Sequence, residues 1–135
     1  MTSYLHTMYR ITDPAKSRAF YEALGFQFSN EFDIVRDGKR EATNYFFSLG
    51  AQENVLELTF NHDGRSYELG TAYGHIAIGV PDAAATCAAV REKAAALGGA
   101  VTREPGPVQG GSTVIAFLTD PDGYKIELIE RPGGT

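Results

Sequence analysis

The sequence of 135 residues contains a single cysteine, Cys87, so no disulfide can form within the chain. A lack of disulfides is typical of a reducing compartment and favours a cytoplasmic location. No apolar run approaches the length of about 20 residues that a membrane-spanning helix needs. Residues 1–11 also lack the basic start and the long apolar stretch of a signal peptide. We therefore expect neither a secreted disulfide scaffold nor a membrane partner.

Clusters of positive charge are missing as well. The formal net charge is −5, and Lys and Arg form no run anywhere. Nucleic acids and anionic membrane surfaces are bound through such clusters, so neither class of partner is expected. What the sequence does have is a hydrophobic fraction of 43%, which is enough to build a core without disulfides. The length and this fraction predict a single domain, residues 1–135.

A repeat with a period of about 70 residues runs through the sequence. His6 and His75 each open a short apolar stretch, which leads to a helix start containing Asp and Pro and to a helix stop at glycine. These signals predict helices over residues 15–24 and 83–97. The predicted strands are 5–11, 26–29, 44–49 and 55–60 in the first half, and 76–80, 101–103, 113–118 and 125–129 in the second. The pattern indicates an α+β fold of two pseudo-symmetric βαβββ modules, at approximately 4–61 and 74–131.

The two modules carry one histidine and one glutamate each at matching positions. His75 lies 69 residues after His6, and Glu127 lies 70 residues after Glu57. Each glutamate stands between apolar strand residues, where an unpaired charge would be costly, so a cation or a hydrogen-bonding partner is required. Pseudo-symmetry would bring two nitrogen and two oxygen ligands together, a set that suits Ni, Co, Zn, Mn or Fe as divalent ions. We predict one six-coordinate ion, completed by two waters.

The alternative for any one of these histidines is a hydrogen-bonded core residue, but the repetition at matched positions favours a metal site. The third histidine, His62, has no counterpart in the other module and is expected to be solvated. The simplest prediction for Cys87 is a small buried side chain in the second helix.

Four strings of this sequence carry a family resemblance that covers nearly the whole chain: LHTMYR from residue 5, LELTFN from 56, YELGTAYGHIA from 67 and DPDGYKIEL from 120. They resemble the lactoylglutathione lyase (glyoxalase I) family of the vicinal oxygen chelate superfamily. The resemblance implies that His6, Glu57, His75 and Glu127 are the metal ligands. Histidine at the first position implies Ni²⁺ or Co²⁺, with Zn²⁺ possible. It also implies a homodimer in which one module from each chain completes each site.

The implied substrate is the hemithioacetal of methylglyoxal and a thiol such as glutathione, and the implied carboxylate contacts are Arg10 and Asn61. Each lies four residues beyond a metal ligand on the same strand face, at about 3.3 Å per residue or roughly 13 Å. Arg103 is a further candidate contact, because Gln109 stands where many family members have a lysine in the Gly106-Pro107-Val108 loop. The second helix is also about one turn longer than in bacterial members.

We predict Glu127 as the catalytic base, with Glu57 acting on the opposite face of the substrate, because a carboxylate beside the ion can accept a proton. Other functions occur on the same fold, including dioxygenases, epimerases, thiol transferases and metal-free drug-binding proteins. Four protein ligands argue against a dioxygenase, which leaves positions open for substrate and oxygen. A drug-binding protein would not require His and Glu at matched positions. A thiol transferase shares both metal and thiol sites and is distinguished by its product.

Overall fold

The computed structural model describes residues 1–133, except for the side chains of residues 94 and 95. The chain divides into two compact units, Met1–Glu68 and Leu69–Thr135, each with one helix and one four-stranded sheet. The elements are β1 (Thr7–Ile11), α1 (Pro14–Leu24), β2 (Gln27–Arg36), β3 (Lys39–Leu49), β4 (Gln52–Asn61), β5 (Ile76–Val80), α2 (Ala83–Leu97), β6 (Ala100–Pro107), β7 (Val114–Thr119) and β8 (Lys125–Glu130). The predicted α+β fold of two βαβββ modules is confirmed. The single domain stays a prediction.

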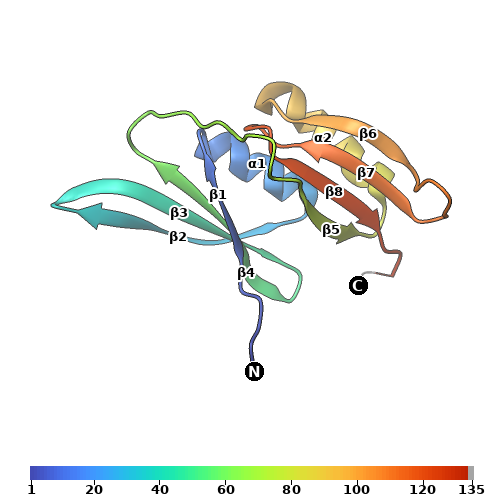
Figure 1. The fold of residues 1–135 in the computed structure, drawn as a ribbon, viewed down its shortest axis with the longest axis horizontal. Helices are drawn as coiled ribbons and strands as arrows, with labels where there is room; N and C mark the ends of the chain where they lie inside the picture. The colour runs from blue at the N-terminus through green and yellow to red at the C-terminus, as the bar shows by residue number, and fades with distance from the viewer. Residues whose placement is uncertain (134–135) are drawn as a thin grey trace. The chain divides into compact units, whose positions relative to one another are not determined.

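The two sheets have the same topology, β1-β4-β3-β2 in the first unit and β5-β8-β7-β6 in the second (Figure 1). In each, the first strand of the module pairs in parallel with the last strand, and the remaining pairs are antiparallel. The strand after each predicted histidine therefore lies directly beside the strand that carries the matching glutamate. This arrangement makes a site from residues far apart in the sequence.

The helix α1 covers one face of the first sheet and leaves the other face open. It begins at Asp13, whose carboxylate accepts from the backbone N–H of Lys16 at 3.1 Å, and it ends at Gly25, whose φ of 112° is left-handed. Tyr21 of α1 is fully buried; its ring centre lies 6.2 Å from that of Phe47, and its hydroxyl hydrogen-bonds the hydroxyl of Tyr9 at 2.6 Å. Burial of such rings stabilises the core of this unit.

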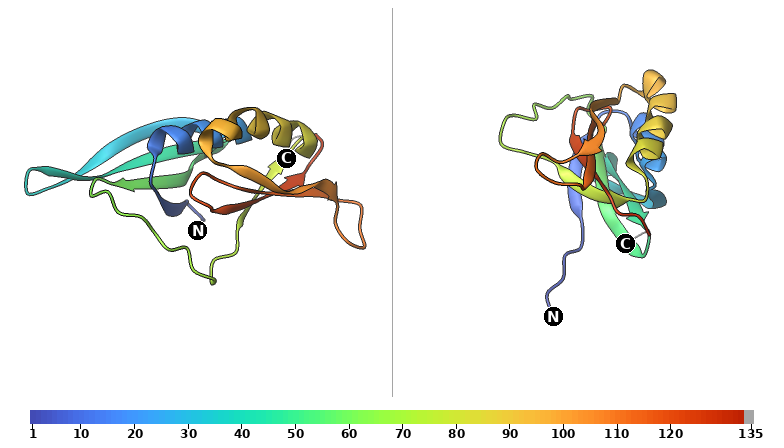
Figure 2. Two further views of the ribbon diagram at one scale, coloured as in Figure 1. Left: turned by 90° about the horizontal axis from the view of Figure 1, so that it is seen from above. Right: turned by 90° about the vertical axis from the view of Figure 1, so that its right-hand side faces the viewer.

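The helix α2 covers one face of the second sheet in the same way (Figure 2). Its bounds agree with the prediction. The Asp82 carboxylate accepts from the N–H of Ala85 at 3.0 Å, and the Glu130 carboxylate of β8 accepts from the N–H of Ala83 at 2.9 Å. Cys87 is buried as predicted, and burial raises the pKa of its thiol, which stays protonated at neutral pH. Within residues 1–133, neither helix has the length and apolar character needed to cross a bilayer.

The hairpin of β2 and β3 is much longer than the sequence predicted. The expected strands 26–29 and 44–49 extend to Gln27–Arg36 and Lys39–Leu49, which pair up to the turn. The turn consists of Asp37 and Gly38 with φ values of 53° and 75°. A two-residue turn with positive φ at both central residues matches the twist of the two strands that it connects. The predicted strands were therefore too short at this end of the first sheet. Here β2 and β3 continue to the turn because their exposed residues pair with each other.

Candidate metal and substrate site

Each unit brings one histidine next to one glutamate. In the first, Nε2 of His6 lies 2.9 Å from Oε1 of Glu57. In the second, Nε2 of His75 lies 3.1 Å from Oε1 of Glu127. The histidine directly precedes the first strand and the glutamate lies in the neighbouring parallel strand, so both side chains project from the same face. The face is the one that the helix of each unit does not cover.

The two pairs also have matching surroundings. The histidine side chains are both 37% exposed, and the glutamates are 14% and 16% exposed. An aromatic ring from the next strand meets each histidine edge-on, Phe46 at 5.9 Å from His6 and Phe117 at 5.1 Å from His75. Neither ring was predicted as a site residue, although their separation of 71 residues follows the repeat. They hold the imidazoles in place beside the carboxylates.

The chemistry of the two pairs fits a divalent cation. Among the described residues, neither glutamate forms an ion pair with Lys or Arg, and each carboxylate faces an imidazole nitrogen. A largely buried carboxylate beside an imidazole nitrogen is a combination typical of metal ligands. In the part of the chain that the structure describes, no three His, Cys, Asp or Glu residues gather in one cluster, so each unit offers two ligands. One imidazole nitrogen and one carboxylate oxygen in each unit are donors that suit a divalent transition-metal ion.

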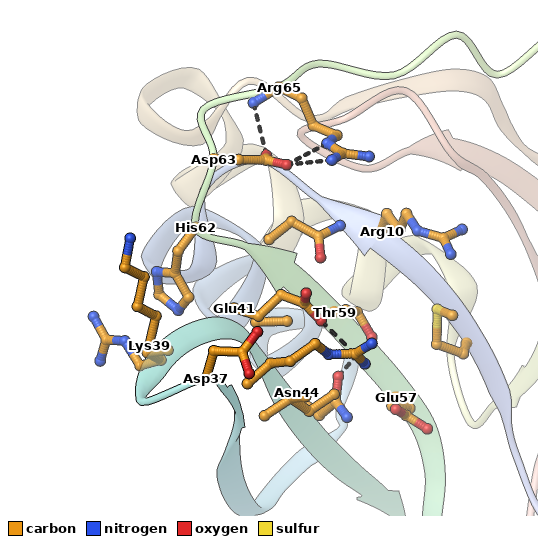
Figure 3. Close-up of a pocket in the computed structure, with 16 residues that line it drawn as sticks. Arg10, Asp37, Lys39, Glu41, Asn44, Glu57, Thr59, His62, Asp63 and Arg65 are labelled. Carbon is orange, nitrogen blue, oxygen red and sulfur yellow. Dashed lines mark hydrogen bonds and ion pairs between the residues drawn. The ribbon is translucent and has the colours of Figure 1, made fainter.

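A cavity of about 820 Å³ opens on the same face of the first sheet (Figure 3). Glu57 of β4 lines it together with Arg10 of β1 and Asn61 at the end of β4. The structure therefore gathers three of the predicted site residues around one space. Further lining residues come from the β2–β3 hairpin, none of which was predicted as a site residue. They include Arg36, Lys39 and Arg40.

Polar side chains in this cavity are held by hydrogen bonds. The Thr59 hydroxyl donates to the Asn44 side-chain oxygen at 2.8 Å, and the Asn61 amide donates to the Tyr67 hydroxyl at 2.8 Å. The amide of Asn61 keeps a second N–H with which it could bind a carboxylate. Two arginines of the β2–β3 hairpin pair with acidic residues. Arg36 lies 3.4 Å from Glu41, and Arg40 lies 4.0 Å from Asp33. Contacts within the fold therefore fix several of the side chains that line the cavity.

Arg103 has a different setting from the one expected of a substrate contact. Its guanidinium donates to the carbonyl oxygens of Gly106 at 2.9 Å, Pro107 at 3.0 Å and Ile115 at 2.8 Å. The pairing of β6 and β7 shifts register between Arg103 and Gly106, and such a bulge leaves backbone carbonyls without ladder partners. Arg103 satisfies them, so most of its hydrogen-bonding capacity is used by the fold. A substrate contact from Arg103 stays a prediction.

His62 is not the solvated residue that the sequence suggested. It is half-buried, with its ring edge-on to Phe60 at 4.8 Å. The Thr43 hydroxyl donates to the Asp33 carboxylate at 2.7 Å, so Nε2 of His62, 2.8 Å from the same hydroxyl, is the donor in the second contact. These contacts make His62 part of the structure at the base of the hairpin.

Comparison with known proteins agrees with this fold. Residues 3–128 match the Glyoxalase/Bleomycin resistance protein/Dioxygenase superfamily. The chain is 50% identical over 133 residues to the lactoylglutathione lyase of Haemophilus influenzae, which covers 94% of this chain and 91% of that protein. It is 48% identical over 132 residues to the lactoylglutathione lyase of Salmonella typhimurium, with 93% and 90% covered.

Solved structures give the same result. Glyoxalase I from Zea mays superposes with a TM-score of 0.83 at 40% identity, covering 95% of this chain. This chain spans 44% of the maize protein. The trypanothione-dependent glyoxalase I of Leishmania major superposes with a TM-score of 0.77 at 37% identity, covering 96% of this chain and 87% of that one. The chain therefore belongs to the glyoxalase/bleomycin resistance protein/dioxygenase superfamily and, within it, to the lactoylglutathione lyase (glyoxalase I) family.

Proposed function

We propose that this protein is a metal-dependent glyoxalase I, which converts the hemithioacetal of methylglyoxal and glutathione into S-lactoylglutathione. The observation that carries the proposal is the repeated His–Glu pair, at 2.9 Å and 3.1 Å on equivalent strands of two sheets. The lactoylglutathione lyases to which the chain is about half identical support the choice of reaction and thiol. The protein would thus remove methylglyoxal.

His6, Glu57, His75 and Glu127 would hold the ion. A bound divalent cation polarises the oxygens of the substrate and stabilises negative charge that develops on them. The reaction moves one hydrogen from the hemithioacetal carbon to the neighbouring carbonyl carbon. The carboxylate of Glu127 accepts this proton and returns it, and Glu57 acts on the opposite face. Their low exposure keeps bulk water from competing for the proton.

Arg10 and Asn61 would bind a carboxylate of the thiol, because both line the cavity that Glu57 shares. A guanidinium and an amide are suitable donors for this purpose. The histidine at the first ligand position favours Ni²⁺ or Co²⁺ over Zn²⁺. A homodimer, with one module from each chain at each site, rests on the family resemblance. The cytoplasmic location rests on the single cysteine.

The proposal is tested by assaying the metal-free protein with methylglyoxal and glutathione after adding Ni²⁺, Co²⁺, Zn²⁺, Mn²⁺ or Mg²⁺ separately. We expect S-lactoylglutathione as the product, with the highest rates in Ni²⁺ and Co²⁺. Product analysis by mass spectrometry separates this reaction from a thiol transfer, which would join the thiol to an added electrophile. A protein that forms no thioester with any of the five metals would contradict the proposed function.

Replacing Arg10 with alanine should raise KM for the glutathione adduct about ten- to a hundredfold and leave kcat within about threefold. A remote carboxylate is bound equally in the ground state and the transition state, and a hydrogen bond to a charged group is worth about 1.5–3 kcal/mol. Steady-state kinetics at saturating metal measure both constants. Arg18→Ala, which removes an exposed arginine of α1, is the matched control. A fall in kcat at unchanged KM would assign Arg10 to the chemical step instead.

A further inference from the structure

The internal repeat continues beyond the proposed metal ligands. On the first strands, the face that begins with His6 reaches Arg10 four residues later, and the face that begins with His75 reaches Gly79. On the last strands, Asn61 lies four residues after Glu57 and Arg131 lies four residues after Glu127. The positions of the first module's carboxylate contacts are thus occupied by a glycine and an arginine in the second. Each module therefore has one arginine at these positions. In the first module it is Arg10 on the first strand, and in the second it is Arg131, directly after the last strand.

The structure brings Gly79 and Arg131 into contact. A Cβ atom added to Gly79 would lie 3.2 Å from Cγ of Arg131, closer than side chains normally approach. The backbone N–H of Arg131 donates to the carbonyl of Val80 at 2.7 Å, which extends the pairing of β5 and β8 past the last residue of β8. The missing side chain at Gly79 therefore leaves room for the arginine to lie across β5.

The direction of Arg131 follows from its neighbours on the strand. Leu128 is fully buried, and Glu130 reaches the first turn of α2, so these two side chains point to the helix side of the sheet. Side chains alternate along a strand, which places Arg131 on the opposite face together with Glu127 and Ile129. Arg131 thus lies on the face of the proposed metal ligands, about 13 Å along the strand from Glu127 at 3.3 Å per residue.

The other cations of this face have partners within the fold. Arg103 donates to four backbone carbonyls at the bulge of β6, and Lys125 lies over the ring of Phe117 at 5.7 Å from its centre. Arg131 is exposed and, within the described residues, has no carboxylate within 4.0 Å. The loop from Val108 to Thr113 contains no charged residue. Arg131 is therefore the cation on this face with its guanidinium available to a ligand.

We propose that Arg131, lying across Gly79, is a specificity-determining residue that binds a carboxylate of the thiol substrate. It is the second module's counterpart of Arg10. The inference rests on the proposed function, because glutathione carries two carboxylates and Arg10 with Asn61 would bind one of them. The guanidinium offers paired N–H donors, which match both oxygens of a carboxylate. A second arginine contact would favour a thiol with two carboxylates over one that has none.

The test compares wild type with Arg131→Ala, Arg131→Lys and Lys93→Ala. The last removes one exposed positive charge from α2 and is the control. For the glutathione adduct, we expect Arg131→Ala to raise KM about tenfold, consistent with one hydrogen-bonded ion contact, while kcat changes less than twofold. Arg131→Lys should recover part of this loss. Calorimetric titration with S-hexylglutathione should show a similar weakening without any turnover. Unfolding temperatures check that the variants are folded.

Gly79→Ala tests the contact itself. The added methyl group must displace Arg131, so we expect KM to rise about two- to threefold in the wild-type background and to stay unchanged in the Arg131→Ala background, as coupled residues behave. Equal constants for Arg131→Ala and Lys93→Ala would overturn the inference. So would independent, additive effects of the Gly79 and Arg131 substitutions, or a wild type that binds no S-hexylglutathione. A protein that binds S-hexylglutathione through Arg131 but makes no thioester would instead contradict the proposed function alone.

Discussion

Replacing Glu127 with glutamine should lower kcat by about 10²- to 10⁴-fold while the protein keeps part of its metal, because a positioned general base contributes a factor of this size. The amide still offers an oxygen as a ligand but has no basic oxygen to take a proton. The substitution keeps the size of the side chain, which is 16% exposed and faces Nε2 of His75 at 3.1 Å. Kinetics at saturating metal separate this loss from weaker metal binding, since a neutral ligand replaces an anionic one.

Two further variants complete this experiment. Glu92→Gln, at an exposed position of α2, removes one negative charge far from the proposed ligands in sequence and should have wild-type kinetics. Glu57→Gln reports on the equivalent carboxylate of the first module. If Glu127→Gln retains near wild-type kcat when fully metallated and Glu57→Gln does not, proton transfer belongs to Glu57 and Glu127 is only a ligand.

The architecture could be predicted because its signals are local and repeated. Asp13 and Gly25 mark the ends of α1 through a cap and a left-handed residue, and both do so in the structure. The apolar residues around Glu57 predicted which face of the strand is buried, and Leu56 and Leu58 are 1% and 0% exposed. These features depend on a few neighbouring residues, so they can be recognised in a single sequence.

The β2–β3 hairpin could not be predicted from its hydrophobic pattern. Along β2, only Phe28 and Ile34 are even partly buried, and the alternation of apolar and polar residues that identifies a strand is interrupted at Asn30 and Val35. The strands form because they pair with each other through the Asp37-Gly38 turn, and this dipeptide was the available signal. The missed segment matters for function, because it supplies several of the residues that line the cavity.

The candidate site was predictable in its repeated residues and not where the repeat changes residue type. The histidine and glutamate pairs have the same chemistry in both modules, so a shared offset identifies them. The position of Arg10 in the first module is occupied by Gly79 in the second, and the second module's arginine, Arg131, follows the neighbouring strand. Only the pairing of β5 with β8, and the position of the Arg131 side chain against Gly79, connects them. Such an exchange across strands depends on tertiary structure.

Substitution of the proposed metal-binding histidines should have the second large effect. We expect one divalent ion per chain, and we expect His6→Ala and His75→Ala each to weaken metal binding by more than about 100-fold, because even residues that only orient a ligand contribute 10- to 100-fold. The two pairs lie in separate units with two ligands each. If all four bind one ion, loss of either histidine removes a ligand from the same ion, and the double variant should lose little more activity than either single one.

Competition with a colorimetric chelator measures the affinity, and elemental analysis after dialysis gives the number of ions per chain. His62→Ala is the matched control, because the His62 ring bonds to Thr43 and packs on Phe60 rather than facing a glutamate. This variant should keep wild-type metal content, with any cost confined to its unfolding temperature. Two ions per wild-type chain would mean that each His–Glu pair binds its own metal. Tight binding that survives His75→Ala but not His6→Ala would restrict the ligands to the first unit, and Glu127 could then no longer act beside the ion.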